Sequence, residues 1–295
     1  MSIQERAMLI QVSLENYTGR KAARTLAEDV AEEKGAEKDS LTMTLKLIPR
    51  DELKDVEAAT RAITEYYDKN TLVWIRRGPS LLPVEIYDDF MARLGELVRN
   101  REAAVERFKN RYEYMSGHWL ARLNGLAGAD YIMPTADDVA GRYTAKIDIT
   151  PIPDGRDFRI NLGEDEVQRL AAAADAAAAE RVKLAVADAV SRLRAVVERF
   201  AKNLEVKTVQ GDGPLAGKTR KGRVSSAMER DLRDILGVLP AFNLTGDPRI
   251  DQIAKECQGL LDTPADVLKV DDIQRHITRE KAVKIADKMR SVFGE

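Results

Sequence analysis

The stretch that decides the fold is NLGEDEVQRLAAAADAAAAERVKLAVADAVSRLRAVVERFAKNLEV, residues 161–206. In its second half apolar residues recur at steps of four and three, a heptad pattern that predicts one long helix with an apolar seam. Asn161 and Glu164 resemble a capping box with Asn in place of Ser or Thr, so the helix should begin there. The seam consists of Val186, Val190, Leu193, Val197, Phe200 and Leu204.

A seam of this length needs a partner, and two partners are possible. One is a second long helix, predicted over residues 83–114, which would form an antiparallel hairpin with residues 161–206 inside one chain. The other is the same seam in a second subunit, as an intermolecular coiled coil. Residues 171–179 are nearly all alanine, and such small side chains favour close contact with another helix. We expect the protein to be a homo-oligomer, because the seam is long and the net charge is small.

The rest of the chain predicts a mainly α fold with a small β element. Residues 22–34 and 51–69 have helical patterns, the second as an amphipathic stripe. Residues 72–79 form an apolar and then basic extended link. Residues 8–14, 41–47 and 143–149 are expected to be strands, and residues 158–160 a possible partner of the last. For residues 41–47 a helix continuing to Pro49 is the competing interpretation.

The sequence also predicts how the chain divides. Residues 207–223 are rich in Gly and in charge, which is typical of a linker. Three helices should follow it, with starts marked by the capping residues Asp247, Thr263 and Asp271. We therefore expect a long-helix body with the small β element over residues 1–206, a basic linker over 207–223 and a small C-terminal helical domain over 224–295.

Composition restricts the classes of function. The chain has 295 residues, of which 47 are basic and 49 acidic, giving a net charge of −2. Bulk electrostatics therefore cannot attract a polyanion, and any nucleic-acid site must be local. Nowhere do eighteen apolar residues follow one another, and the first 24 residues do not resemble a signal peptide. We expect no membrane partner and a cytoplasmic location.

Three local basic clusters are candidate nucleic-acid sites. In the linker, five cations face only Asp212, which leaves the segment positive by four. Flexible basic segments suit phosphate contact, and a solvated linker is the alternative. The other two clusters combine an aromatic residue with arginine, as in single-strand binding platforms, and ordinary packing is the alternative there. The clusters are Lys207, Lys218, Arg220, Lys221 and Arg223; Tyr17 with Arg20, Lys21 and Arg24; and Trp74 with Arg76 and Arg77.

No pattern predicts catalysis, a metal or a cofactor. Residues 213–219, GPLAGKT, end like a phosphate-binding Walker A loop, but the spacing between the first glycine and Gly217-Lys218 does not fit. His118 and His276 have no second ligand at metal spacing. Cys257 lies in a helical pattern and should be a buried small hydrophobe. We therefore expect a protein that is not an enzyme.

Four short motifs, taken in order, resemble an uncharacterised family of tailed-phage and prophage proteins. The resemblance runs from about residue 8 to residue 290. It implies a phage or mobile-element setting, sometimes with a MoxR-like AAA+ ATPase and a von Willebrand A-type protein encoded nearby, and it implies no established activity. The motifs are Thr18-Gly19-Arg20-Lys21, Leu81-Leu82-Pro83 with Tyr87, Asp157-Phe158-Arg159, and Leu239-Pro240 leading to Asn243-Leu244-Thr245-Gly246-Asp247-Pro248.

Two functions follow as expectations. The basic clusters and the phage setting favour a non-enzymatic accessory protein associated with single- or double-stranded DNA. The alternative is an adaptor or structural partner of an AAA+ ATPase machine.

Overall fold

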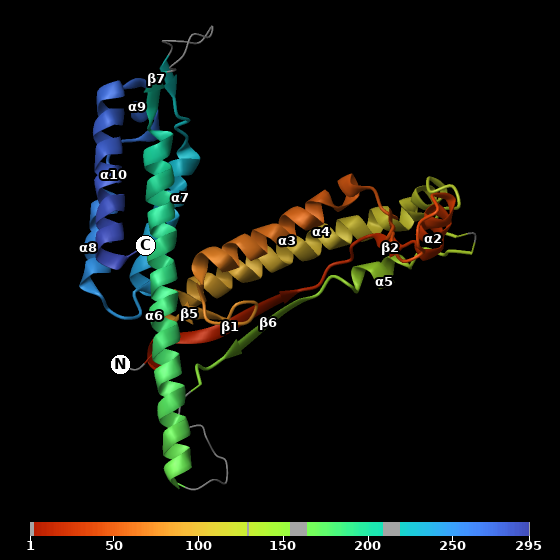
Figure 1. Ribbon diagram of the computed structural model, residues 1–295, viewed down its shortest axis with the longest axis horizontal. Coiled ribbons are helices and arrows are strands. Elements are labelled where there is room, and N and C mark those ends of the chain that lie inside the picture. The colour runs from red at the N-terminus through yellow and green to blue at the C-terminus, as the bar shows by residue number, and fades with distance from the viewer. Residues whose placement is uncertain (1–2, 129, 154–163, 209–218, 295) are drawn as a thin grey trace. The chain divides into compact units, whose positions relative to one another are not determined.

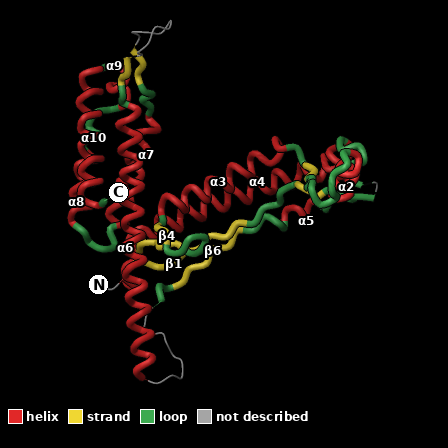
Figure 2. The backbone as a smooth tube through the Cα atoms, viewed as in Figure 1, coloured by secondary structure: helices red, strands yellow, loops and turns green. Residues whose placement is uncertain are grey.

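The computed structural model describes residues 3–128, 130–153, 164–208 and 219–294. It is mainly helical with small antiparallel sheets, which confirms the expected fold class (Figures 1 and 2). The elements are α1 (Ile3–Arg6), β1 (Ala7–Leu14), β2 (Arg20–Ala22), α2 (Arg24–Glu33), β3 (Thr44–Lys46), α3 (Arg50–Asn70), β4 (Leu72–Val73), β5 (Ser80–Pro83), η1 (Val84–Ile86), α4 (Tyr87–Ala121), α5 (Ala136–Ala140), β6 (Ala145–Thr150), α6 (Glu164–Asn203), β7 (Val206–Thr208), β8 (Thr219–Lys221), α7 (Ser226–Phe242), α8 (Pro248–Gln258), α9 (Ala265–Val270) and α10 (Asp272–Phe293).

The chain forms two compact units that interleave in sequence. Unit 1 contains residues 1–10, 69–88 and 149–295, and unit 2 contains residues 11–68 and 89–148. This division differs from the one expected at residues 207–223. The helices after residue 224 share one hydrophobic core with α6, so they and the long helix belong to the same unit.

In unit 1, α6 packs against α7 and α10 (Figure 1). Helix α10 runs antiparallel to α6: Arg275, near its start, contacts the carbonyl of Leu204 just after α6, whereas Arg290, near its end, pairs with Glu198, six residues earlier in the sequence than Leu204. The six seam residues are all buried in this core. The expected hairpin with residues 83–114 was therefore wrong about the partner: the apolar seam is covered by C-terminal helices of its own unit.

The alanine-rich half of α6 corrects a second expectation. Between residues 164 and 179 only Ala178 is buried, so this stretch does not lie closely against another described helix. Alanine has the highest intrinsic helix propensity, and it needs no packing partner to favour the helical backbone. Apart from Ala178, the run therefore extends the helix without contributing to the core.

A four-stranded sheet has the strand order β4-β5-β1-β6. Strand β1 pairs antiparallel with β5, with Leu9 opposite Leu81, and β4 pairs antiparallel with β5, with Leu72 opposite Leu81. Strand β5 was not predicted, because a first-turn Pro83 indicated a helix start. All four residues of β5, Ser80-Leu81-Leu82-Pro83, are buried, so the strand has no period-2 signal.

Unit 2 is built on α3 and α4, whose apolar faces share a core. This core includes Leu53 and Val56 from α3 and Val105 and Phe108 from α4. Along the same pair of helices, the rings of Tyr66 and Phe90 stack at 5.3 Å between centroids. The helix of residues 83–114 thus packs against the helix of residues 51–69. That helix has an apolar stripe of the same periodicity and is the preceding long helix in the chain.

The expected strands and caps have mixed outcomes. Strands occur within residues 8–14, 41–47 and 143–149, whereas residues 158–160 and Asn161 lie outside the described residues. Asp247 and Asp271 accept backbone N–H bonds at the starts of α8 and α10, as predicted. Thr263 does not cap α9; the N–H of Ala265 donates instead to the carboxylate of Glu229 on α7.

Candidate functional site

The β7–β8 ribbon stands at the end of α6 and is fixed there by a buried arginine (Figure 1). The guanidinium of Arg275 donates to the carbonyls of Leu204 (2.9 Å) and Asn203 (3.0 Å) at the end of the helix. It also donates to the carbonyl of Gly222 (2.6 Å), directly after β8. A cation at a helix C-terminus satisfies carbonyls that have no intrahelical partner. One side chain thereby joins α6, α10 and the base of the ribbon.

The approach of the chain at Gly222 requires glycine. A Cβ atom at this position would lie 2.5 Å from the carbonyl oxygen of Asn203, closer than real Cβ contacts. The N–H of Gly222 donates to the carbonyl of Glu205 at 2.8 Å. Burial lowers the pKa of Arg275 from its ordinary value, and the side chain is only 2% exposed. An arginine remains charged under such conditions, so the base of the ribbon is held by charge-assisted bonds.

Part of the linker cluster lies in the β7–β8 ribbon. Its register places Lys207 opposite Arg220. The ammonium of Lys221 pairs with Asp272 on α10 at 2.5 Å, and Arg223 is exposed. Lys218 and most of the Walker-like segment lie outside the described residues. The structure thus brings three of the expected basic residues to one ribbon and neutralises one of them.

A second basic ribbon lies in unit 2, where β2 pairs antiparallel with β3. Its register places Arg20 directly opposite Lys46, and both residues are exposed. Lys21 was expected to be available to nucleic acid. Instead its ammonium donates to the carbonyl of Ala127 and lies 4.1 Å from the ring centroid of Tyr131. Sequence analysis missed Lys46, because only strand pairing brings it to Arg20.

The two aromatic residues proposed as stacking platforms are corrected by the structure. Trp74 is 6% exposed, in the core of unit 1, and the guanidinium of Arg181 lies 5.3 Å from its ring centroid. Tyr17 is also buried, and Arg142 covers its ring at 5.4 Å. Arg76 and Arg77 are exposed in the turn between β4 and β5, with Arg77 at φ +63°. The arginines of the third cluster remain accessible, whereas its tryptophan does not.

The seam residues proposed for oligomerisation are also reassigned. Val186, Val190 and Leu193 are no more than 6% exposed, and Val197, Phe200 and Leu204 are fully buried. They form the core of unit 1, so they offer no surface to a second subunit. Self-association of the protein stays a prediction that would need another surface.

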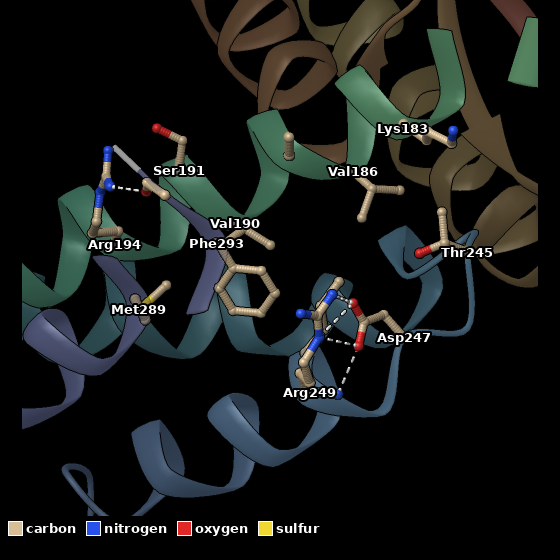
Figure 3. Close-up of a pocket in the computed structure, with 13 residues that line it drawn as sticks. Lys183, Val186, Val190, Ser191, Arg194, Thr245, Asp247, Arg249, Met289 and Phe293 are labelled. Atoms are coloured by element: carbon tan, nitrogen blue, oxygen red, sulfur yellow. Dashed lines mark hydrogen bonds and ion pairs between the residues drawn. The ribbon is translucent and has the colours of Figure 1, made fainter. Parts of the chain in front are cut away.

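Unit 1 contains a pocket that no sequence motif indicated (Figure 3). It has a volume of about 540 Å³ and lies between one face of α6, the start of α8 and the end of α10. The walls include Val190, Ile250 and Phe293, and cations from α6 and α8 surround them. Asp247 binds Arg249 through both carboxylate oxygens, at 2.6 to 3.0 Å. The sequence signals nearby were the heptad seam, through Val186 and Val190, and the Asp247-Pro248 cap, and neither indicates a pocket.

Other candidate chemistry is limited. Cys257 is buried as expected, and burial raises the pKa of its thiol to about 12, which keeps it protonated near neutral pH. Among the described residues, no group of three or more His, Cys, Asp or Glu side chains could hold a metal ion. Within the same residues no helix is both long and apolar enough to cross a bilayer.

Comparisons with protein-family models, with curated proteins and with solved structures find no match for this chain.

Proposed function

We propose that this chain is a non-enzymatic phage or prophage accessory protein that contacts the phosphate backbone of DNA through its two basic β-ribbons. The observation that carries the proposal is the placement of two exposed cations, Arg20 and Lys46, at directly opposite positions of β2–β3. Like charges in this arrangement repel each other and destabilise the ribbon. A phosphate bound between them removes the repulsion, so the pair favours binding over stability.

The β7–β8 ribbon supports the same function. Its register also pairs two basic residues, Lys207 and Arg220, and Arg275 holds its base rigidly. A two-stranded ribbon has the dimensions to enter the major groove of duplex DNA. Because Trp74 and Tyr17 are buried, the predicted base-stacking platforms are absent from the surface, and duplex DNA is the favoured form.

Removing the β7–β8 charges should weaken the salt dependence of DNA binding. Each phosphate contact contributes about 0.9 to the slope of log K against log salt for duplex DNA. Since Lys221 is paired with Asp272, we expect the combined Lys218→Ala, Arg220→Ala, Lys221→Ala and Arg223→Ala variant to lower the slope by about 3. Fluorescence anisotropy with a labelled duplex at several salt concentrations measures this slope.

A variant of equal charge change serves as the control. Arg61, Arg99, Lys281 and Lys284 are exposed and lie outside both ribbons. Their combined replacement by Ala should leave most of the slope unchanged. The β7–β8 ribbon would have no role in DNA binding if the parent and the ribbon variant gave equal slopes of log K against log salt. The same would follow if the parent did not bind DNA at low salt.

The β2–β3 pair predicts opposite effects on stability and binding. Lys46→Glu turns a repulsive cross-strand pair into an attractive one, so it should raise the free energy of unfolding by roughly 0.2–1 kcal/mol. The same change should weaken DNA binding and lower the salt slope by about 2, because Lys46 is lost and the new carboxylate also pairs with Arg20. Urea unfolding and anisotropy test both effects, with Lys284→Glu on α10 as the control. A lower free energy of unfolding together with an unchanged affinity for DNA would contradict this role for Lys46.

The alternative function, an adaptor or structural partner of an AAA+ ATPase, is favoured by a different surface. Four aliphatic residues of α9 and α10 are exposed, with Val270 at 81% and Ile273 at 72%. Exposed apolar patches of this kind often mark protein interfaces. The adaptor function would be favoured if the parent retains an ATPase encoded by a neighbouring gene and does not bind DNA. The combined Val270→Asp and Ile273→Asp variant should then lose the ATPase. The aliphatic residues are Val267, Val270, Ile273 and Ile277.

A further inference from the structure

The pocket of unit 1 combines an apolar floor with a cation at its edge (Figure 3). Val186 and Val190 of α6 are buried at the floor, together with Ile250 and Met289. Pockets that bind small ligands have volumes of roughly 300–1,000 Å³ and mostly apolar walls with a few polar groups. The volume of about 540 Å³ and the composition of this pocket fit that description.

The charges of the pocket favour an anion. Arg249 is neutralised by Asp247, whose carboxylate also accepts the N–H of Arg249 at the start of α8. Arg194 differs: its guanidinium donates to the carbonyl of Gly294 at 3.0 Å, and no carboxylate among the described residues pairs with it. Arginine has five N–H donors, so donors remain for a ligand. Lys183, eleven residues earlier on α6, is paired with Glu180 at 3.7 Å, so among the described lining residues Arg194 is the cation with donors left for an anion.

The shape of the pocket selects an elongated ligand. Lys183 and Arg194 are separated by three turns of α6, roughly 16 Å along the helix axis. Between them, the exposed face of Ala187 and the rings and methyl groups of Phe293 and Val190 line the pocket. Ser191 lies three residues before Arg194 on α6, and both line the pocket (Figure 3).

We propose that this pocket binds a linear aliphatic carboxylate, with its carboxylate at Arg194 and Ser191 and its chain along α6 towards Lys183. The guanidinium binds a carboxylate through parallel, charge-assisted hydrogen bonds. The aliphatic chain leaves water for the surface formed by Ala187, Val190 and Phe293, which supplies the hydrophobic part of the affinity. This site is independent of the DNA-binding proposal, because it involves neither ribbon.

Isothermal titration calorimetry with decanoate, below its micelle concentration, tests the proposal on the full chain. We expect saturable binding of one decanoate, and at least tenfold weaker binding of neutral 1-decanol. Arg194→Gln should weaken decanoate binding about tenfold, since one charged hydrogen-bonding pair is lost. Arg199→Gln removes the same charge from α6 outside the pocket, and it should change the affinity less than twofold.

Blocking variants separate this pocket from adventitious apolar surface. Ala187→Phe places a ring in the pocket at an exposed position, so the fold should survive while decanoate binding is lost. Ala187→Leu is a second blocking variant if the phenylalanine disturbs folding, and Ala195→Phe is the control on the exposed face of the same helix. Absence of decanoate binding to the parent, or equal binding to the parent and both blocking variants, would overturn the assignment. Equal binding to Arg194→Gln would overturn the position of the carboxylate.

Discussion

A chain carrying both Val190→Asp and Val197→Asp should fail to fold unit 1. Val197 is fully buried and Val190 is 6% exposed, and both face the helices that follow residue 224. A carboxylate buried without a partner destabilises a protein by roughly 4 kcal/mol or more. Two such changes approach the whole stability of an ordinary domain, about 5–15 kcal/mol. Far-ultraviolet circular dichroism should show a loss of helix, and amide hydrogen exchange should show a loss of protection within residues 182–293.

The matched control places the same charges on the exposed face of the same helix. Leu184 is 62% exposed, and Ala195 is also exposed, so Leu184→Asp with Ala195→Asp should leave the helix content unchanged. The molar mass from light scattering shows whether the seam is a core or an interface between subunits. If the Val190→Asp and Val197→Asp chain stayed folded and only its assembly became smaller, the seam would be an interface between subunits, contrary to its position in this structure.

Arg101→Met should destabilise unit 2 by about 3–5 kcal/mol. Arg101 is 2% exposed on α4, and its guanidinium donates to the carbonyl of Thr144 (3.2 Å), the hydroxyl of Thr60 (3.1 Å) and the backbone of Glu15. These groups belong to three different segments. Methionine fills similar volume but has no donors, so the carbonyls of Glu15 and Thr144 and the hydroxyl of Thr60 would lose a charged donor. Urea unfolding followed by tyrosine fluorescence measures the change.

Arg107→Met is the matched control for Arg101. Arg107 lies on the same helix but is exposed, so the stability of unit 2 should change by less than about 0.5 kcal/mol. Hydrogen exchange should also show that Arg101→Met loosens the backbone at Glu15 and Thr144, whose N–H and carbonyl are joined at 3.0 Å. Equal stability of the two variants would mean that the contacts of Arg101 contribute little to the fold.

Several features could be predicted from the sequence because their physical signal is local. The apolar stripes of residues 51–69 and 83–114 and the heptad seam each identify a helix; α3, α4 and α6 occur there, with α4 beginning at Tyr87 rather than at Pro83. The caps at Asp247 and Asp271 were predictable for the same reason, since the capping side chain lies next to the N–H groups that it accepts. The basic clusters were visible as composition. Their accessibility was not, because burial of Trp74 depends on Arg181 and the surrounding core.

By itself, the sequence determined which segments are helical, which faces of them are apolar and where the positive charges cluster. Only the tertiary structure decided which apolar face meets which. An apolar stripe reduces its exposure to water against any complementary stripe, because the hydrophobic effect has no direction, so periodicity does not identify the partner. The same holds for Lys46 beside Arg20, for Arg275 below the β7–β8 ribbon and for the pocket at Arg194: each joins residues that are distant in sequence, and the contacts exist only after the chain has folded.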